Sequence, residues 1–225
     1  MTMNINEQLD GFMGLVRGYF FPEFYGQSLD TEIKGSLIGL IYSSLNFSSM
    51  KEDAEALAPR FMGSLPEVKR LLMTDVEAIL HNDPAVTGVA EVVLCYPAIV
   101  VMTHYRTAHA LYEAGVPLLP RMISERAHSA TGVEIHPAAR IGEYFAIDHG
   151  TGVVVGATCI IGNHVMLYQG VTLGAKNFKY DEKGQPMDLP RHPILEDNVT
   201  VYSNTSILGR VRIGHDTVVG GNVWL

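Results

Sequence analysis

The sequence predicts an α+β protein, in which an N-terminal α-helical domain is followed by a C-terminal left-handed parallel β-helix of hexapeptide repeats. Two observations predict this fold. Up to about residue 130, apolar residues have the three-and-four spacing of amphipathic helices. From about residue 131, aliphatic residues recur at every sixth position, a period that fits neither an α-helix nor a hairpin sheet. We therefore place one domain at 1–130 and the other at 131–225.

Three stretches in the first half predict amphipathic helices. Apolar residues lie three and four apart in 29–45 and in 64–83, as they do on one face of a helix. We expect the second of these helices to begin with Ser64 as its N-cap and Pro66 in its first turn. A third helix is predicted over 96–115. Successive helices with short breaks indicate a helical bundle.

Three runs of aliphatic residues establish the period of six in the second half. Each group of six would form one side of a triangular coil, with its aliphatic residue inside and glycine at many of the corners. The runs are Ile135, Ile141, Ile147 and Val153; Val155, Ile161, Leu167 and Leu173; and Leu195, Val201, Ile207, Ile213, Val219 and Leu225. Three such runs in one half of the chain make chance spacing of ordinary strands a poor explanation.

Two places interrupt the repeat. At 148–152, with sequence DHGTG, two extra residues shift the pattern, and an acid and a histidine stand beside two glycines. At 174–191, a polar segment that contains Gly and Pro predicts a loop protruding from the coil. Because binding residues are often carried by loops on a rigid scaffold, we expect both interruptions to face one site.

Composition and charge exclude several classes of function. The net charge of −8 argues against nucleic acid as a main partner, since phosphate binding needs clustered Lys and Arg. Cys95 and Cys159 lie far apart, which is typical of reduced thiols in a cytoplasmic protein. The N-terminus lacks a signal-peptide pattern, and the most apolar window, 92–102, is too short to span a bilayer. We therefore expect a cytoplasmic protein without a membrane partner.

Three motifs within this pattern resemble those of a known enzyme family. DPA (83–85), DHGTG (148–152) and RHP (191–193) are similar to motifs of bacterial and plant serine O-acetyltransferases. Hexapeptide repeats alone would indicate only the wider acyltransferase superfamily, whereas the three motifs together point to serine. The resemblance covers about residues 65–225. It implies transfer of an acetyl group from acetyl-CoA to the hydroxyl of L-serine, giving O-acetylserine and CoA, the first step of cysteine biosynthesis.

The resemblance also implies a general base. Serine's hydroxyl is a poor nucleophile at neutral pH, so a base must take its proton as the attack begins. Imidazole suits this role, because its ordinary pKa is ~6.5. The family's catalytic histidine falls on His149, and the carboxylate that pairs with it falls on Glu134, where many members have Asp. Glu134 lies 15 residues before His149, close to one full coil, so contact between them is expected.

Substrate-binding residues follow from the same resemblance. Serine is a zwitterion, whose ammonium group needs carboxylates and whose carboxylate needs Arg or a protonated His. The residues implied are Asp83 and Asp148 for the ammonium, Arg191 and His192 for the carboxylate, and Gly174, Ala175 and Ser203 for the CoA arm. Family members often have a second glycine at the position of Ala175 and a shorter loop before RHP.

Partners, too, are implied by the family. Its members form trimers through the β-helix and often hexamers through the helical domains, so we expect a homo-oligomer. Many bind O-acetylserine sulfhydrylase through a C-terminal tail, and many are inhibited by cysteine. Acetyl-CoA is the expected co-substrate, and no metal is expected.

Three alternatives remain open. Another hexapeptide O-acetyltransferase would act on a different hydroxy amino acid or on a sugar, but a sugar offers no ammonium or carboxylate to Asp83 and Arg191. A β-helix carbonic anhydrase needs three converging histidines around zinc, and no close histidine pair lies within the repeats. The third is a scaffold without enzymatic activity, and a histidine at the interruption argues against it.

Overall fold

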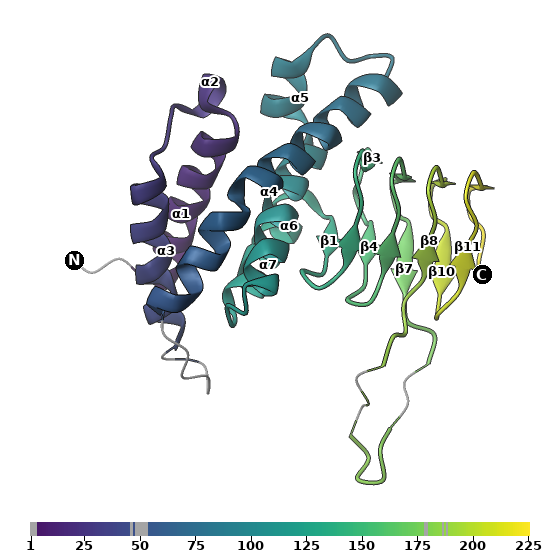
Figure 1. The fold of residues 1–225 in the computed structure, drawn as a ribbon. Coiled ribbons are helices and arrows are strands. Elements are labelled where there is room, and N and C mark those ends of the chain that lie inside the picture. Colours follow the sequence, from purple (N-terminus) through teal and green to yellow (C-terminus); the bar gives the residue numbers. More distant parts are fainter. Residues whose placement is uncertain (1–3, 46, 48–53, 178–179, 186, 188) are drawn as a thin grey trace.

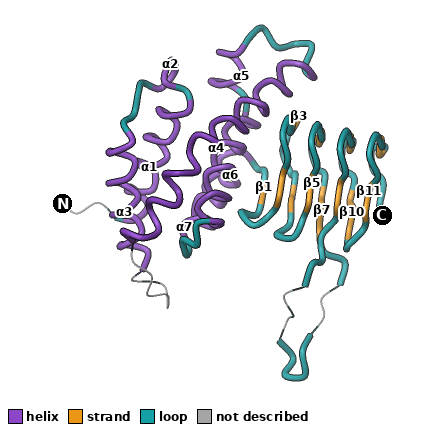
Figure 2. The backbone as a smooth tube through the Cα atoms, viewed as in Figure 1, coloured by secondary structure: helices purple, strands orange, loops and turns teal. Residues whose placement is uncertain are grey.

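A computed structural model describes residues 4–45, 47, 54–177, 180–185, 187 and 189–225. Its helices lie at one end of the molecule and its strands at the other (Figures 1 and 2). The helices are α1 (Ile5–Phe20), α2 (Pro22–Tyr25), α3 (Asp30–Leu45), α4 (Ala54–Asn82), α5 (Val89–Cys95), α6 (Pro97–Glu113) and α7 (Leu119–Thr131). Among the described residues, no helix has both the length and the apolar character needed to cross a membrane.

The helices over 29–45 and 96–115 are confirmed as α3 and α6. The predicted helix start at Ser64 is wrong, because α4 runs without a break from Ala54 to Asn82. Ser64 lies inside this helix, where its hydroxyl donates to the carbonyl of Phe61 at 2.7 Å. The helix passes through its prolines because its apolar face is buried against its neighbours, and tertiary packing outweighs the local signals.

Short strands form the second part of the molecule, and they belong to three parallel sheets. Sheet A consists of β1 (Glu134–Ile135), β4 (Val154–Val155), β7 (Thr172–Gly174) and β10 (Ser206–Leu208). Sheet B consists of β2 (Arg140–Ile141), β5 (Ile160–Ile161), β8 (Ile194–Leu195) and β11 (Arg212–Ile213). Sheet C consists of β3 (Ala146–Asp148), β6 (Met166–Tyr168), β9 (Thr200–Val201) and β12 (Val218–Val219). The chain visits A, B and C in turn, so it winds as a three-sided coil.

The register of the strands locates both interruptions. Paired residues in neighbouring turns of the coil are 18 positions apart in the sequence where the coil is regular. They are 20 positions apart across 148–152 and 34 apart across 174–191. The pairs that give these intervals are Ile194 with Arg212, Glu134 with Val154, and Ile160 with Ile194. Of the aliphatic residues that establish the period of six, all except Leu225 are buried. The aliphatic residues therefore fill the coil, and each interruption lengthens one turn of it.

The coil has three edges, which we name by the sheets that they join. The A–B edge comprises 136–139, 156–159, the described residues within 175–193, and 209–211; the B–C edge 142–145, 162–165, 196–199 and 214–217; and the C–A edge 149–153, 169–171, 202–205 and 220–223. The long loop leaves the A–B edge (Figure 1).

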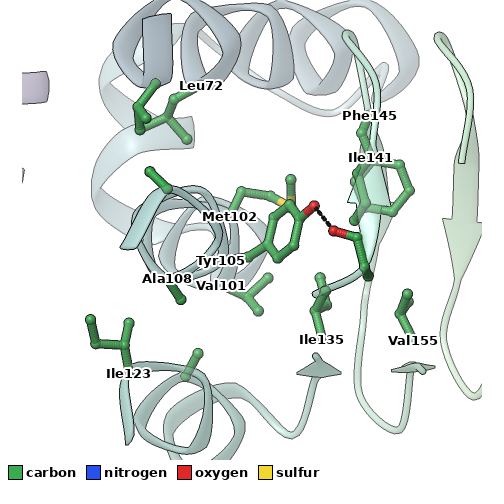
Figure 3. Close-up of a cluster of buried hydrophobic side chains, with 14 of the residues drawn as sticks. Leu72, Val101, Met102, Tyr105, Ala108, Ile123, Ile135, Ile141, Phe145 and Val155 are labelled. Atoms are coloured by element: carbon green, nitrogen blue, oxygen red, sulfur yellow. Dashed lines mark hydrogen bonds between the residues drawn. The ribbon is translucent and has the colours of Figure 1, made fainter. Parts of the chain in front are cut away.

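The helical part is attached to the first turn of the coil by apolar packing and buried polar contacts. Figure 3 shows Tyr105 of α6 among apolar side chains from helices and strands, with its hydroxyl donating to the carbonyl of Ala139 at 2.8 Å. Beside it, the guanidinium of Arg106 donates to both carboxylate oxygens of Asp75 on α4, at 2.9 and 3.0 Å. The same guanidinium donates to the carbonyl of Ile141 at 2.7 Å. These contacts hold α4 and α6 against the coil.

Candidate active site

A cavity of about 380 Å³ lies where the segment between α4 and α6 meets the C–A edge. It brings together three of the predicted site residues, Asp83, Asp148 and His149. Asp83 directly follows α4, Asp148 ends β3, and His149 begins the turn after it. The remaining lining residues are Cys95, Tyr96, Pro97, Ala98 and Ile147. The cavity therefore joins two chain segments whose nearest lining residues, Ala98 and Ile147, are 49 positions apart in the sequence.

The two-residue interruption presents His149 to solvent. Its side chain is 69% exposed, and its Nδ1 lies 3.6 Å from Oδ1 of Asp148. The backbone turns sharply here, with φ of +58° at His149 and +80° at both Gly150 and Gly152. Other corners of the coil contain non-glycine residues with the same left-handed φ, Asn204 among them, so this conformation belongs to the coil rather than to the site alone. The imidazole is accessible and stands beside a carboxylate.

Asp83 is held as a carboxylate by two donors. Its Oδ2 accepts from the hydroxyl of Tyr96 at 2.5 Å, and its Oδ1 accepts from the backbone N–H of Ala85 at 2.8 Å. The Tyr96 hydrogen bond, the Ala85 hydrogen bond and the nearby His149 all lower the pKa of Asp83. With Asp148 in the same cavity, two carboxylates are available to a cationic group beside the imidazole.

Arg191 and His192 lie at the A–B edge, in a network around Thr158. The hydroxyl oxygen of Thr158 accepts from the backbone N–H groups of Arg191 and His192 at 2.9 and 3.1 Å, and it lies 2.8 Å from Nδ1 of His192. That Nδ1 also accepts from the N–H of Thr158 at 3.1 Å, so it carries no proton. Gly156 leaves room for the ring, because a Cβ there would lie 2.0 Å from Cδ2 of His192.

His192 is therefore a neutral imidazole rather than the cation that carboxylate binding would favour. Burial, followed by the charges of Arg191, His136 and Arg210, lowers the pKa of His192 to about 4. The residue is only 7% exposed. Any contribution to binding a carboxylate has to come from its Nε2–H, and the permanent positive charge at this edge comes from the arginines.

One chain does not bring all the predicted site residues together. Arg191 and His192 lie on the A–B edge, whereas Asp148 and His149 lie on the C–A edge, across the width of sheet A. The predicted CoA-binding residues divide in the same way. Gly174 ends β7 and leads through Ala175 into the A–B loop, while Ser203 is on the C–A edge.

Glu134 lies at the start of sheet A, in register with Val154 of the next turn. Within the described part of the chain, its carboxylate pairs with Arg121 of α7 at 3.5 Å, and no hydrogen bond joins it to His149. A pairing of Glu134 with His149 stays a prediction.

Tyr96 is a site residue that the sequence did not reveal. It is neither acidic nor basic, and it lies 13 positions from Asp83, so no motif or period connects the two. The only local signal is the Tyr–Pro pair at the start of the helix over 96–115. Among the residues that the structure describes, no cluster of three or more His, Cys, Asp or Glu is arranged to hold a metal ion.

Fold and site together define a class of protein, a parallel three-sided coil with a histidine and two carboxylates in a cavity at one edge. No family model matches the chain. A serine acetyltransferase of Synechococcus elongatus is 49% identical over 177 residues, covering 78% of this chain and 56% of the relative. Native serine acetyltransferase 1 of Entamoeba histolytica has a TM-score of 0.82 and 35% identity, covering 95% of this chain and 81% of that one.

A serine acetyltransferase solved in complex with CoA has a TM-score of 0.65 and 26% identity, covering 99% of this chain and 91% of that one. The chain therefore belongs to the serine acetyltransferase family. It spans a little over half, 56%, of the length of the Synechococcus relative.

Proposed function

We propose that this chain acts as a serine O-acetyltransferase, which transfers acetyl from acetyl-CoA to the hydroxyl of L-serine and gives O-acetylserine and CoA. This reaction would begin cysteine biosynthesis. The observation that carries the proposal is the cavity in which His149 stands with Asp83 and Asp148, in a chain of the serine acetyltransferase family. The similar structure solved with CoA supports acetyl-CoA as the co-substrate.

In the proposed reaction, the imidazole of His149 takes the proton of the serine hydroxyl as its oxygen attacks the thioester carbonyl. The tetrahedral intermediate then collapses, the carbon–sulfur bond breaks, and the imidazolium returns the proton to the CoA thiolate. Asp83 and Asp148 bind the ammonium group of serine, which places the hydroxyl near the base. Glu134, once it leaves Arg121, would hold the other ring nitrogen of His149 and stabilise the imidazolium.

The site is completed by a second copy of the chain. We infer a left-handed β-helix of hexapeptide repeats over 131–225, preceded by a helical domain over 1–130 and interrupted by the loop at 174–191. Three such β-helices would assemble so that the A–B edge of one copy faces the C–A edge of the next. Arg191 and His192 of one copy would then bind the carboxylate of the serine held at Asp83 of its neighbour.

The same arrangement forms a groove for the CoA arm between two copies. Gly174 and Ala175 would contribute from one copy and Ser203 from the other. The helical domains would join two trimers into a hexamer. Cytoplasmic location fits the free thiols of Cys95 and Cys159. Docking to O-acetylserine sulfhydrylase rests on the family resemblance alone.

The alternative is an O-acetyltransferase for another hydroxy amino acid or a sugar. Thiol release from acetyl-CoA should be measured with L-serine, homoserine, threonine and a galactoside. We expect the highest kcat/KM with L-serine, and a preference for the galactoside would replace the proposal. Substitution of His149 by Ala should lower kcat with serine by ~10² to 10⁴ while the fold is retained. A turnover close to that of the unmodified protein would remove His149 from the role of base.

A further inference from the structure

Tyr96 lines the cavity and lies at the junction of two helices, α5 and α6. Its backbone N–H donates to the carbonyl of Val92 as α5 ends, and its own carbonyl accepts from the N–H of Ile99 as α6 begins. Its φ of −81° and ψ of 122° are those that a following proline enforces, and Pro97 is the first residue of α6. The backbone at Tyr96 is therefore held on both sides, which fixes the direction in which the ring leaves the chain.

From this position the ring reaches the carboxylate of Asp83. The Tyr96 hydroxyl donates to Oδ2 at 2.5 Å, while the backbone N–H of Ala85 donates to Oδ1 at 2.8 Å. Each oxygen thus accepts one hydrogen bond and keeps one lone pair free. The hydrogen bond to Asp83 is the largest of the effects that raise the pKa of Tyr96 to about 12, and the charges of Glu91 and Asp148 contribute. The hydroxyl therefore remains a donor throughout the physiological pH range.

Asp83 needs such support because of where it lies. It follows the last residue of α4, in a segment that ends at α5. Among the described residues, two hydrogen bonds reach its carboxylate, and of these the one from Tyr96 comes from outside this segment. A carboxylate held at one oxygen by a local turn can still rotate. A second donor on the other oxygen, from a different helix junction, fixes its plane. A site held in place in this way loses less entropy when it binds a ligand.

We propose that Tyr96 is a positioning residue for amino-group recognition: its hydroxyl orients the Asp83 carboxylate so that the free lone pairs face the substrate's ammonium beside His149. The inference rests on the proposed function, because it assigns Asp83 to the ammonium of serine. Tyr96 acts through Asp83 and takes no part in proton transfer. Its effect should therefore appear in the binding of serine and leave the chemistry of acetyl transfer largely unchanged.

The test is steady-state kinetics of Tyr96→Phe, measured by thiol release. We expect kcat/KM for serine to fall by about 10- to 100-fold, because the variant loses a hydrogen bond to a charged group. Most of this fall should come from a higher KM for serine, while KM for acetyl-CoA stays unchanged. Tyr25→Phe is the matched control. The Tyr25 hydroxyl donates to the carbonyl of Val93 on α5 at 3.2 Å, outside the cavity lining. This variant should keep the original constants for both substrates.

A double-mutant cycle with Asp83→Asn distinguishes positioning from a separate role. If Tyr96 acts through Asp83, the double variant will have the serine kcat/KM of Asp83→Asn alone. Three outcomes would overturn the inference. The losses in serine kcat/KM of the two single variants could multiply in the double variant, KM for serine could stay unchanged in Tyr96→Phe, or Tyr25→Phe could lose as much serine kcat/KM as Tyr96→Phe. Failure of the unmodified protein to acetylate serine would instead reject the proposed function, so the two failures are distinguishable.

Discussion

His192 illustrates how a single residue can combine a predicted binding role with a structural one. Its Nδ1 accepts from the N–H of Thr158 and lies 2.8 Å from the hydroxyl oxygen of that residue. A proton on Nδ1 would remove the hydrogen bond from the Thr158 N–H. The ring also occupies the space that Gly156 leaves open. The neutral state of His192 is thus part of how this edge of the coil is packed.

The resulting prediction concerns pH. The pKa of His192 in the folded chain is lowered to about 4, below its ordinary value, so the unfolded chain takes up the proton first as the pH falls. The contribution of His192 to stability should be complete at neutral pH and be lost as the pH falls from ~6.5 towards 4. Unfolding midpoints should be measured across this range at fixed protein concentration.

His192→Asn should make the unfolding midpoint less sensitive to acid, whereas His215→Asn should not. His215 is exposed, and its hydrogen bond to Asp216 raises its pKa, which is the opposite direction. Equal acid sensitivity in the unmodified protein and in His192→Asn would contradict this account.

Single residues also show which parts of the candidate site could be predicted from the sequence. Asp83, Asp148 and His149 stand in motifs that could be read directly, and the structure places them in one cavity. Tyr96 was missed, because its partnership with Asp83 is created by the path of the chain between α4 and α6. The charge state of His192 was also beyond prediction, since it depends on burial and on arginines at this edge.

Among the elements, the strands were easier to predict than the helices. A period of six repeats over the whole coil, so an irregular step such as that at 148–152 is visible against it. Helix ends carry only local signals. Ser64 and Pro66 have the residue types of a helix start, yet burial of the apolar face of α4 carries the helix through both.

The ion pair between Asp75 and Arg106 connects α4 and α6, and it leads to a prediction at this scale. Both side chains are almost fully buried, at 0% and 3% exposure. Asp75→Ala would leave the Arg106 guanidinium buried without its partner, so the free energy of unfolding should fall by ~3–5 kcal/mol. Denaturant unfolding at one protein concentration measures this change.

Glu67→Ala is the matched control for this measurement. It removes a carboxylate from an exposed pair with Arg70 on the same helix. A change below ~1 kcal/mol is expected there. If Asp75→Ala were equally mild, the buried pair would not be what joins α4 to α6.

At the scale of the whole molecule, the predicted site residues of one chain lie on two different edges of the coil. A site that contains all of them would need two copies of the chain. Asp83 and His149 share one cavity, whereas Arg191 lies at the other side of sheet A. If the site forms between copies, two inactive variants can compensate for each other. Co-expressed His149→Ala and Arg191→Ala chains should recover about a quarter of the unmodified activity, since in random assembly one interface in four has both residues.

The control pair is His149→Ala with Asp83→Asn. Both residues belong to the same cavity, so no interface in that mixture has a complete site. Recovery in the control pair, or none with Arg191→Ala, would reject the shared site. Size-exclusion chromatography with light scattering should show trimers or hexamers in every mixture.

The long loop at the A–B edge has a consequence for how such a protein diversifies. The strands on either side keep their pairing in all three sheets, although one turn holds sixteen more residues than a regular one. The length and composition of the loop can therefore change without disturbing the pairing of the strands. Segments of different length could be exchanged between relatives there without any compensating change in the paired strands.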